Sequence, residues 1–187
     1  VDCTVIIPSD NESWKDVGEK WMGMKVVRED NALKRNTKAA IQAFNQKNYA
    51  EFWELVENAD RENVGLIACL ADAYCNGFGL ASSDFARAAS LYEKLGKKIR
   101  LKNLPKVVLA NLEYNLACCY HNQTNYIRAA ECAQAAIKHG SIEAWRLIAE
   151  YNEVGEGGYK KDLSYAAKCY EKALLSKCEG VKKEAKD

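Results

Sequence analysis

The sequence predicts an all-α protein built from repeated helix-turn-helix pairs, and three observations support this prediction. First, the pentapeptide "NQKNY" begins at Asn45, and the similar "NQTNY" begins at Asn122. Second, the residues after the first pentapeptide place Phe52, Val56 and Ala59 at positions i, i+4 and i+7, which is one face of a helix. Third, only two prolines occur in 187 residues, so long helices can form without interruption.

Each pentapeptide is expected to be the short turn inside a helix pair. Asn45 and Asn122 should end the first helix, because asparagine tolerates left-handed backbone better than most residues. Asn48 and Asn125 should then cap the second helix by accepting hydrogen bonds from its free backbone N–H groups. Glu51 follows Asn48 by three residues, which completes a capping-box pattern.

A second repeated segment predicts helix pairs with a long turn. The segments "DFARAASLYEK" at Asp84–Lys94 and "DLSYAAKCYEK" at Asp162–Lys172 share the pattern A-A-x-x-Y-E-K. Each follows a glycine-containing turn, and its aspartate should cap the helix that begins there. The chain therefore contains a duplicated block of one short-turn and one long-turn pair. The four predicted pairs lie near Thr37–Ala59, Gly65–Leu95, Asn111–Ile137 and Ile142–Leu175.

The rest of the chain divides into an N-terminal extension (1–36), the helical array (37–175) and a charged tail (176–187). In the extension, Trp14, Val17, Trp21 and Met24 predict an amphipathic helix that caps the first pair. The segment 97–108 should extend one helix and connect the two blocks. Because single pairs cannot bury their apolar faces alone, the pairs are expected to stack into a curved solenoid.

Two spacing patterns resemble a known superfamily. The third pair has apolar and aromatic residues at Leu116, Ala117, Tyr120, Tyr126, Ala129 and Ala136. The long-turn pairs repeat L-x-x-x-Y, a glycine turn and D-x-x-x-A-x-x-x-Y, at Leu70, Tyr74, Gly77, Asp84, Ala88 and Tyr92 and again at Leu147, Tyr151, Gly155, Asp162, Ala166 and Tyr170. The first pattern resembles tetratricopeptide repeats, and the second resembles their SEL-like branch. The short turns depart from the family pattern, with Lys47 and Thr124 in place of the usual glycine.

The resemblance implies a protein-protein interaction scaffold or adaptor that binds a partner protein or peptide along a concave groove. In that superfamily the first helix of each pair lines the groove. The positions that match are Lys38, Asp72, Asn76, Tyr114, Asn115, Trp145 and Arg146. A co-chaperone that grips an acidic chaperone tail is one alternative. Asn115 and Arg146 match two of the five carboxylate-binding positions of such domains, whereas Asp72 would repel a carboxylate.

A secreted SEL-like adaptor or effector is the other alternative. Asn11 and Asn122 each begin a glycosylation sequon. The eight cysteines include no C-x-x-C pair, and most lie in apolar helical segments, which favours reduced thiols and a cytoplasmic protein. Cys132 and Cys169 occupy the same place in their pairs and are expected to pack between helices.

Other function classes find little support in the sequence. A formal charge of +1 argues against nucleic-acid binding, and the absence of a run of about 18 apolar residues argues against membrane insertion. Cys118 and His121 could share a helical face, but a tetrahedral metal site needs more ligands at regular spacing. We therefore expect no catalysis, no bound metal and no cofactor.

Overall fold

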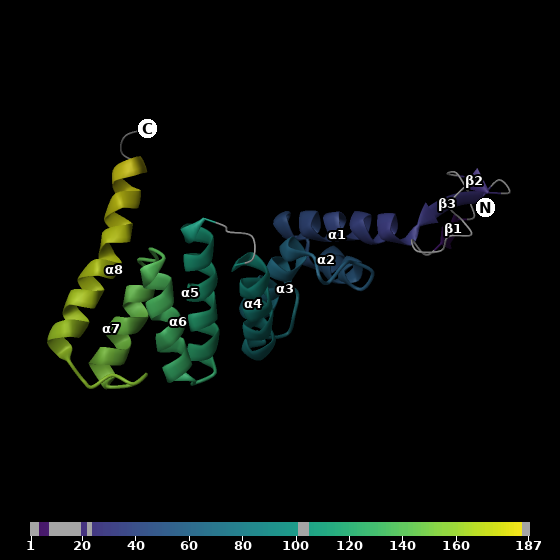
Figure 1. Cartoon of the computed structure of the whole chain (residues 1–187). Coiled ribbons are helices and arrows are strands. Elements are labelled where there is room, and N and C mark those ends of the chain that lie inside the picture. Colours follow the sequence, from purple (N-terminus) through teal and green to yellow (C-terminus); the bar gives the residue numbers. More distant parts are fainter. Residues whose placement is uncertain (1–3, 8–19, 22–23, 101–104, 185–187) are drawn as a thin grey trace. The chain divides into compact units, whose positions relative to one another are not determined.

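A computed structural model describes residues 4–7, 20–21, 24–100 and 105–184 of the chain. From residue 29 onward, these residues form helices joined by turns (Figure 1). The helices are α1 (Glu29–Asn45), α2 (Tyr49–Val56), α3 (Val64–Asn76), α4 (Phe85–Arg100), α5 (Lys106–Asn122), α6 (Tyr126–Lys138), α7 (Ala144–Val154) and α8 (Leu163–Glu184). Helices therefore occupy all four predicted pairs, but α1 begins at Glu29, inside the predicted N-terminal extension, and α8 continues into the segment predicted as a charged tail.

The N-terminal segment forms strands where the sequence predicted a capping helix. The strands β1 (Thr4–Ile7), β2 (Lys20–Trp21) and β3 (Met24–Arg28) form a sheet in the order β1-β3-β2. β1 runs parallel to β3, and β2 runs antiparallel to it, with Trp21 opposite Met24. The predicted helix is thus wrong for Trp21 and Met24, while Trp14 and Val17 lie outside the described residues. β1 and β3 contain consecutive β-branched residues, and these favour strands over helices.

The chain divides into two compact units, Val1–Cys69 and Leu70–Asp187, with the boundary inside α3. In the first unit, α1 packs against α2, and Phe44 meets Phe52 edge to face with 5.2 Å between ring centroids. The Thr37 hydroxyl accepts a hydrogen bond from the backbone N–H of Asp60 at 2.8 Å, which ties α1 to the segment after α2.

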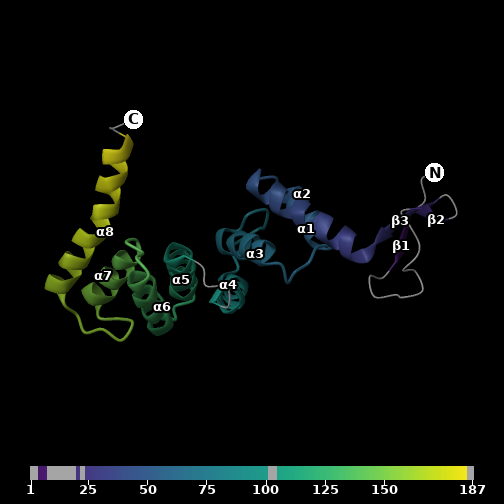
Figure 2. The same cartoon turned by 45° about the horizontal axis from the view of Figure 1, so that its top comes forward.

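The core of the second unit is built mostly from alanine and lies between α5, α6, α7 and α8. These helices follow one another side by side in both views (Figures 1 and 2), and each packs against the next. The buried cluster comprises Ala117, Ala129, Ala130, Ala133, Ala136, Ala144, Leu147, Ile148, Ala149, Tyr151 and Cys169. Small side chains allow helices to approach closely. Cys169 is fully buried and Cys132 packs against this cluster, as the sequence predicted.

The predicted N-caps are confirmed in all four helix pairs. The side chains of Asn48 and Asn125 accept from the backbone N–H groups three residues later, at 3.5 and 3.3 Å. Asp84 and Asp162 do the same at 3.0 and 2.9 Å. Glu51 differs from the capping-box expectation, because its carboxylate accepts from the Asn48 side-chain amide at 2.7 Å.

The left-handed residue of each short turn is not the predicted one. α1 and α5 do end at Asn45 and Asn122. However, the positive φ angles belong to Lys47, at 61°, and Thr124, at 59°. The chain completes its reversal two residues later than expected, immediately before the N-cap asparagines.

Candidate functional site

Two of the predicted site residues meet through a tyrosine that the prediction did not include. The Tyr92 hydroxyl, on α4, donates to Oδ1 of Asp72, on α3, at 2.5 Å. Nδ2 of Asn115, on α5, donates to the same hydroxyl oxygen at 3.3 Å. Burial raises the pKa of the Asp72 carboxyl, and the hydrogen bond from Tyr92 offsets part of this rise. Three helices of the second unit are thus joined through one hydroxyl group.

A second contact joins α5 to α7. The Tyr114 phenol is half-buried and lies close to the guanidinium of Arg146. Burial raises the pKa of Tyr114, and the Arg146 contact partly opposes this rise. Arg146 also forms an ion pair with Glu150, one turn further along α7. Because 52% of the Arg146 side chain remains exposed, its guanidinium is accessible to a ligand.

The remaining predicted residues do not join this arrangement. Nδ2 of Asn76 donates to the backbone carbonyl of Asp72 at 2.9 Å, so this amide caps the end of α3. The ammonium group of Lys172, on α8, lies 3.9 Å from the centroid of the Trp145 ring. Trp145 therefore contacts α8. Lys38 belongs to the first unit, where it lines a pocket of about 270 Å³.

Tyr92 is the main residue that the sequence prediction missed. It is the tyrosine of the repeated A-A-x-x-Y-E-K segment, and its counterpart is Tyr170. The Tyr170 hydroxyl also donates to a carboxylate of the preceding helix, that of Glu153, at 2.8 Å. The signal was therefore present as a repeated tyrosine, but its hydrogen-bonding partners depend on how the helices pack.

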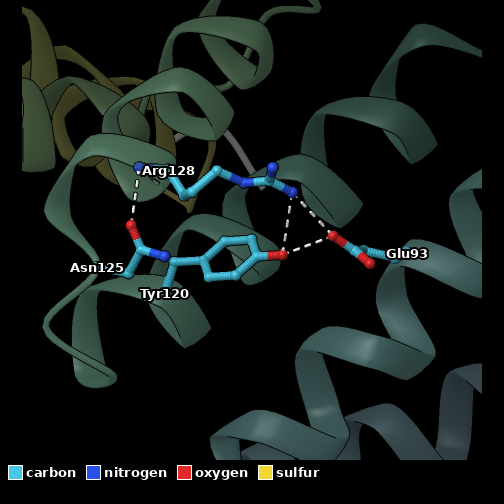
Figure 3. A network of polar contacts seen from close by, with 4 residues as sticks. All are labelled: Glu93, Tyr120, Asn125 and Arg128. Atoms are coloured by element: carbon cyan, nitrogen blue, oxygen red, sulfur yellow. Dashed lines mark hydrogen bonds and ion pairs between the residues drawn. The ribbon is translucent and has the colours of Figure 1, made fainter.

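A separate polar network joins α4, α5 and α6 (Figure 3). The Tyr120 hydroxyl donates to Oε1 of Glu93 at 2.5 Å, and Nη2 of Arg128 reaches the same oxygen at 3.1 Å. The Arg128 guanidinium also lies over the Tyr120 ring, 5.2 Å from its centroid. Arg87 lies over Tyr74 in the preceding pair at 5.5 Å, so the same contact recurs at matching positions. This network stabilises neighbouring helices and contains none of the predicted site residues.

A second pocket is lined by none of the predicted site residues. It has a volume of about 530 Å³ and opens between the α5–α6 turn and the α7–α8 loop. Its lining consists of Thr124, Asn125, Tyr126, Ile127, Gly155, Glu156, Gly157, Gly158, Tyr159 and Lys160.

The histidine and cysteine that the sequence placed on one helical face have separate partners. Nδ1 of His121 lies 3.0 Å from the Tyr151 hydroxyl, whereas Cys118 lies close to the Tyr114 phenol. Over residues 4–7, 20–21, 24–100 and 105–184, no group of three His, Cys, Asp or Glu side chains could hold a metal ion. In the same ranges, no helix has the length and hydrophobicity needed to cross a membrane.

No model of a known protein family matches the chain, and no curated protein sequence matches it.

Proposed function

We propose that this chain is a non-catalytic interaction protein whose helix pairs stack in the manner of tetratricopeptide and SEL-like repeats. It binds an extended peptide, or an extended segment of a partner protein, along α3, α5 and α7. The observation that supports this proposal is the pair of contacts that link these first helices: Asp72 with Asn115 through Tyr92, and Tyr114 with Arg146. Such contacts hold polar groups of successive helices beside one another, as an extended ligand requires.

The charges of these residues suggest which ligand groups would be bound. Arg146 can bind a carboxylate through two parallel hydrogen bonds, because its guanidinium is planar. Its present partner, Glu150, is itself partly exposed, so a ligand carboxylate can share or replace this pair. Asp72 contributes negative charge at the other end and favours a basic or amide group there. An acidic tail along the whole surface is disfavoured for the same reason.

The proposal is tested by identifying a partner through a pull-down with mass spectrometry and titrating it against variants. We expect Arg146→Ala to weaken binding by about 1–3 kcal/mol, which is typical of an interface anchor. Its melting temperature should change little, because half of this side chain is exposed and it supports no buried core.

Two control variants separate the proposed surface from the rest of the protein. Arg87→Ala removes an exposed arginine from α4, a second helix of its pair, and should bind normally. Asn122→Ala removes a turn side chain that bonds to the Cys118 carbonyl and should also bind normally. Normal binding by Arg146→Ala would place the interface elsewhere, and a melting temperature many degrees lower would identify Arg146 as a structural residue.

A further inference from the structure

Two cysteines from different helices are in contact in the second unit. Sγ of Cys119, in the last turn of α5, donates to Sγ of Cys75, near the end of α3, at 3.7 Å. Both carry free thiols. Cys75 is partly exposed, whereas Cys119 is fully buried. A reagent from solvent therefore reaches the first sulfur and finds the second immediately behind it.

We propose that Cys75 and Cys119 are a dithiol site for hydrogen peroxide, which oxidises them to a disulfide that joins α3 to α5. The sulfur atoms must approach by roughly 1.6 Å to reach the S–S bond length of about 2.05 Å. Both cysteines lie in the last turn of a helix, where the backbone adjusts more easily than in the middle. Side-chain rotation at these two ends provides the movement.

The surroundings of the two thiols give them different roles. The hydrogen bond from Cys119 lowers the pKa of Cys75, and burial and the charge of Asp72 oppose this effect. The pKa of Cys119 is raised, because its proton is held against the Cys75 sulfur and its side chain is buried. Since the thiolate is the nucleophile, Cys75 attacks first and Cys119 resolves.

The reaction proceeds in two balanced steps. The Cys75 thiolate attacks one peroxide oxygen, the O–O bond breaks, and hydroxide leaves, so that Cys75 becomes a sulfenic acid. The Cys119 sulfur then attacks the sulfur of this sulfenic acid, forming the S–S bond as the S–O bond breaks. The first hydroxide takes up the proton that Cys75 released on ionising, and the second takes up the Cys119 proton. In total, two thiols and one hydrogen peroxide give one disulfide and two waters.

Cys118 is the competing thiol, because it precedes Cys119 in the sequence and lies close enough to Cys75 for the charge of Cys75 to raise its pKa. Burial raises the pKa of Cys118, and its side chain lies close to the Tyr114 phenol on the same helix. A disulfide between Cys75 and Cys118 would therefore have to break that contact. The geometry favours Cys119, whose sulfur already touches Cys75.

The test treats the reduced, full-length chain with equimolar hydrogen peroxide, blocks the remaining thiols with N-ethylmaleimide and maps the products by mass spectrometry. We expect the loss of two blocked thiols per molecule and a peptide that links Cys75 to the segment containing Cys119. Dithiothreitol should restore both thiols. Oxidation of Cys75 to a sulfinic acid while Cys119 remains free would overturn the proposal.

Variants identify the second sulfur. Cys118→Ser should still form the link, whereas Cys75→Ser and Cys119→Ala should each abolish it. Cys132→Ser removes a partly buried thiol elsewhere in the unit and should leave the link unchanged. Circular dichroism verifies that each variant is folded. Cys75→Ser should disturb folding least, because Cys75 is partly exposed. Loss of the link in Cys118→Ser, or its retention in Cys119→Ala, would overturn the assignment.

Discussion

The Tyr92 hydroxyl donates to Oδ1 of Asp72 at 2.5 Å and thereby joins α4 to α3. The same oxygen accepts from Asn115 on α5, so a single hydroxyl contacts three helices. Burial is the largest cause of the raised pKa values of both Tyr92 and Asp72. The hydrogen bond between Tyr92 and Asp72 therefore replaces bonds with water that burial removes from each group.

Tyr92→Phe should lower the free energy of unfolding by about 1–3 kcal/mol. The substitution leaves the half-buried Asp72 carboxylate without this donor, and hydrogen bonds to charged groups contribute in this range. Urea denaturation of the variant and the parent measures the difference. Tyr170→Phe is the matched control, because its partner Glu153 is exposed and regains water when the hydroxyl is removed. Equal losses in the two variants would contradict this account.

Stability should fall with rising pH from about pH 9 upward. Burial raises the pKa of Cys132 from 9.0 to about 11, and burial with the Glu153 hydrogen bond raises the pKa of Tyr170 from 10.0 to about 12. In this range the unfolded chain has released these protons while the folded chain still holds them, so unfolding becomes more favourable as pH rises. The stabilisation that Cys132 and Tyr170 contribute is complete below their pKa values in the unfolded chain. It is lost as the pH rises to their pKa values in the folded chain.

Urea denaturation at several values between pH 8 and pH 11 measures this dependence. Cys132→Ser should flatten the curve between about pH 9 and pH 11, because it removes one of the titrating groups. The pKa of Cys75 is lowered from 9.0, so its contribution to stability grows with pH only up to about pH 9, and Cys75→Ser should leave the fall above pH 9 unchanged. A stability that rises over this pH range would contradict the assignment.

Thr124→Gly should raise the free energy of unfolding by about 0.5–1 kcal/mol. Thr124 has a φ of 59°, and a β-branched residue is strained in this left-handed region. Glycine removes the strain, and its greater freedom in the unfolded chain cancels part of the gain. Lys47→Gly, at a φ of 61° in the equivalent turn, should stabilise less because lysine is not β-branched. Thermal melts of both variants compare the two turns.

Gly157→Ala should lower the free energy of unfolding by about 2–3 kcal/mol. Gly157 has a φ of 64°, and an added Cβ would lie 3.0 Å from the Tyr126 carbonyl oxygen and 3.2 Å from the Cβ of Ala130. Gly158→Ala is the matched control, because its φ is 85° but nothing lies within 4 Å of the added atom. It should cost only about 1 kcal/mol. Denaturation curves measure both losses. Equal losses of unfolding free energy in the two variants would show that backbone strain alone sets the cost of each substitution.

Part of the site could be predicted from the sequence because the helices align matching positions. The prediction placed Asp72, Asn115 and Arg146 on first helices, and the structure links the first two through Tyr92 and the third to Tyr114. Trp145 could not be placed, because its ring packs toward α8 under Lys172 and this choice depends on the neighbouring helix. The contact between Cys75 and Cys119 was also missed, since it joins residues 44 positions apart.

The sequence by itself determined the helix pairs and their caps, because helical periodicity and capping act over three to seven residues. The bonds at Asn125 and Asp162 follow from such local patterns. Tertiary structure decided the rest. β2 and the first residue of β3 lie where helical spacing suggested a capping helix, and the pairing of β3 with β1 depends on hydrogen bonds between distant segments. The Tyr92 hydroxyl likewise finds its partners only after three helices have packed, because burial removes water from groups that no short sequence window contains.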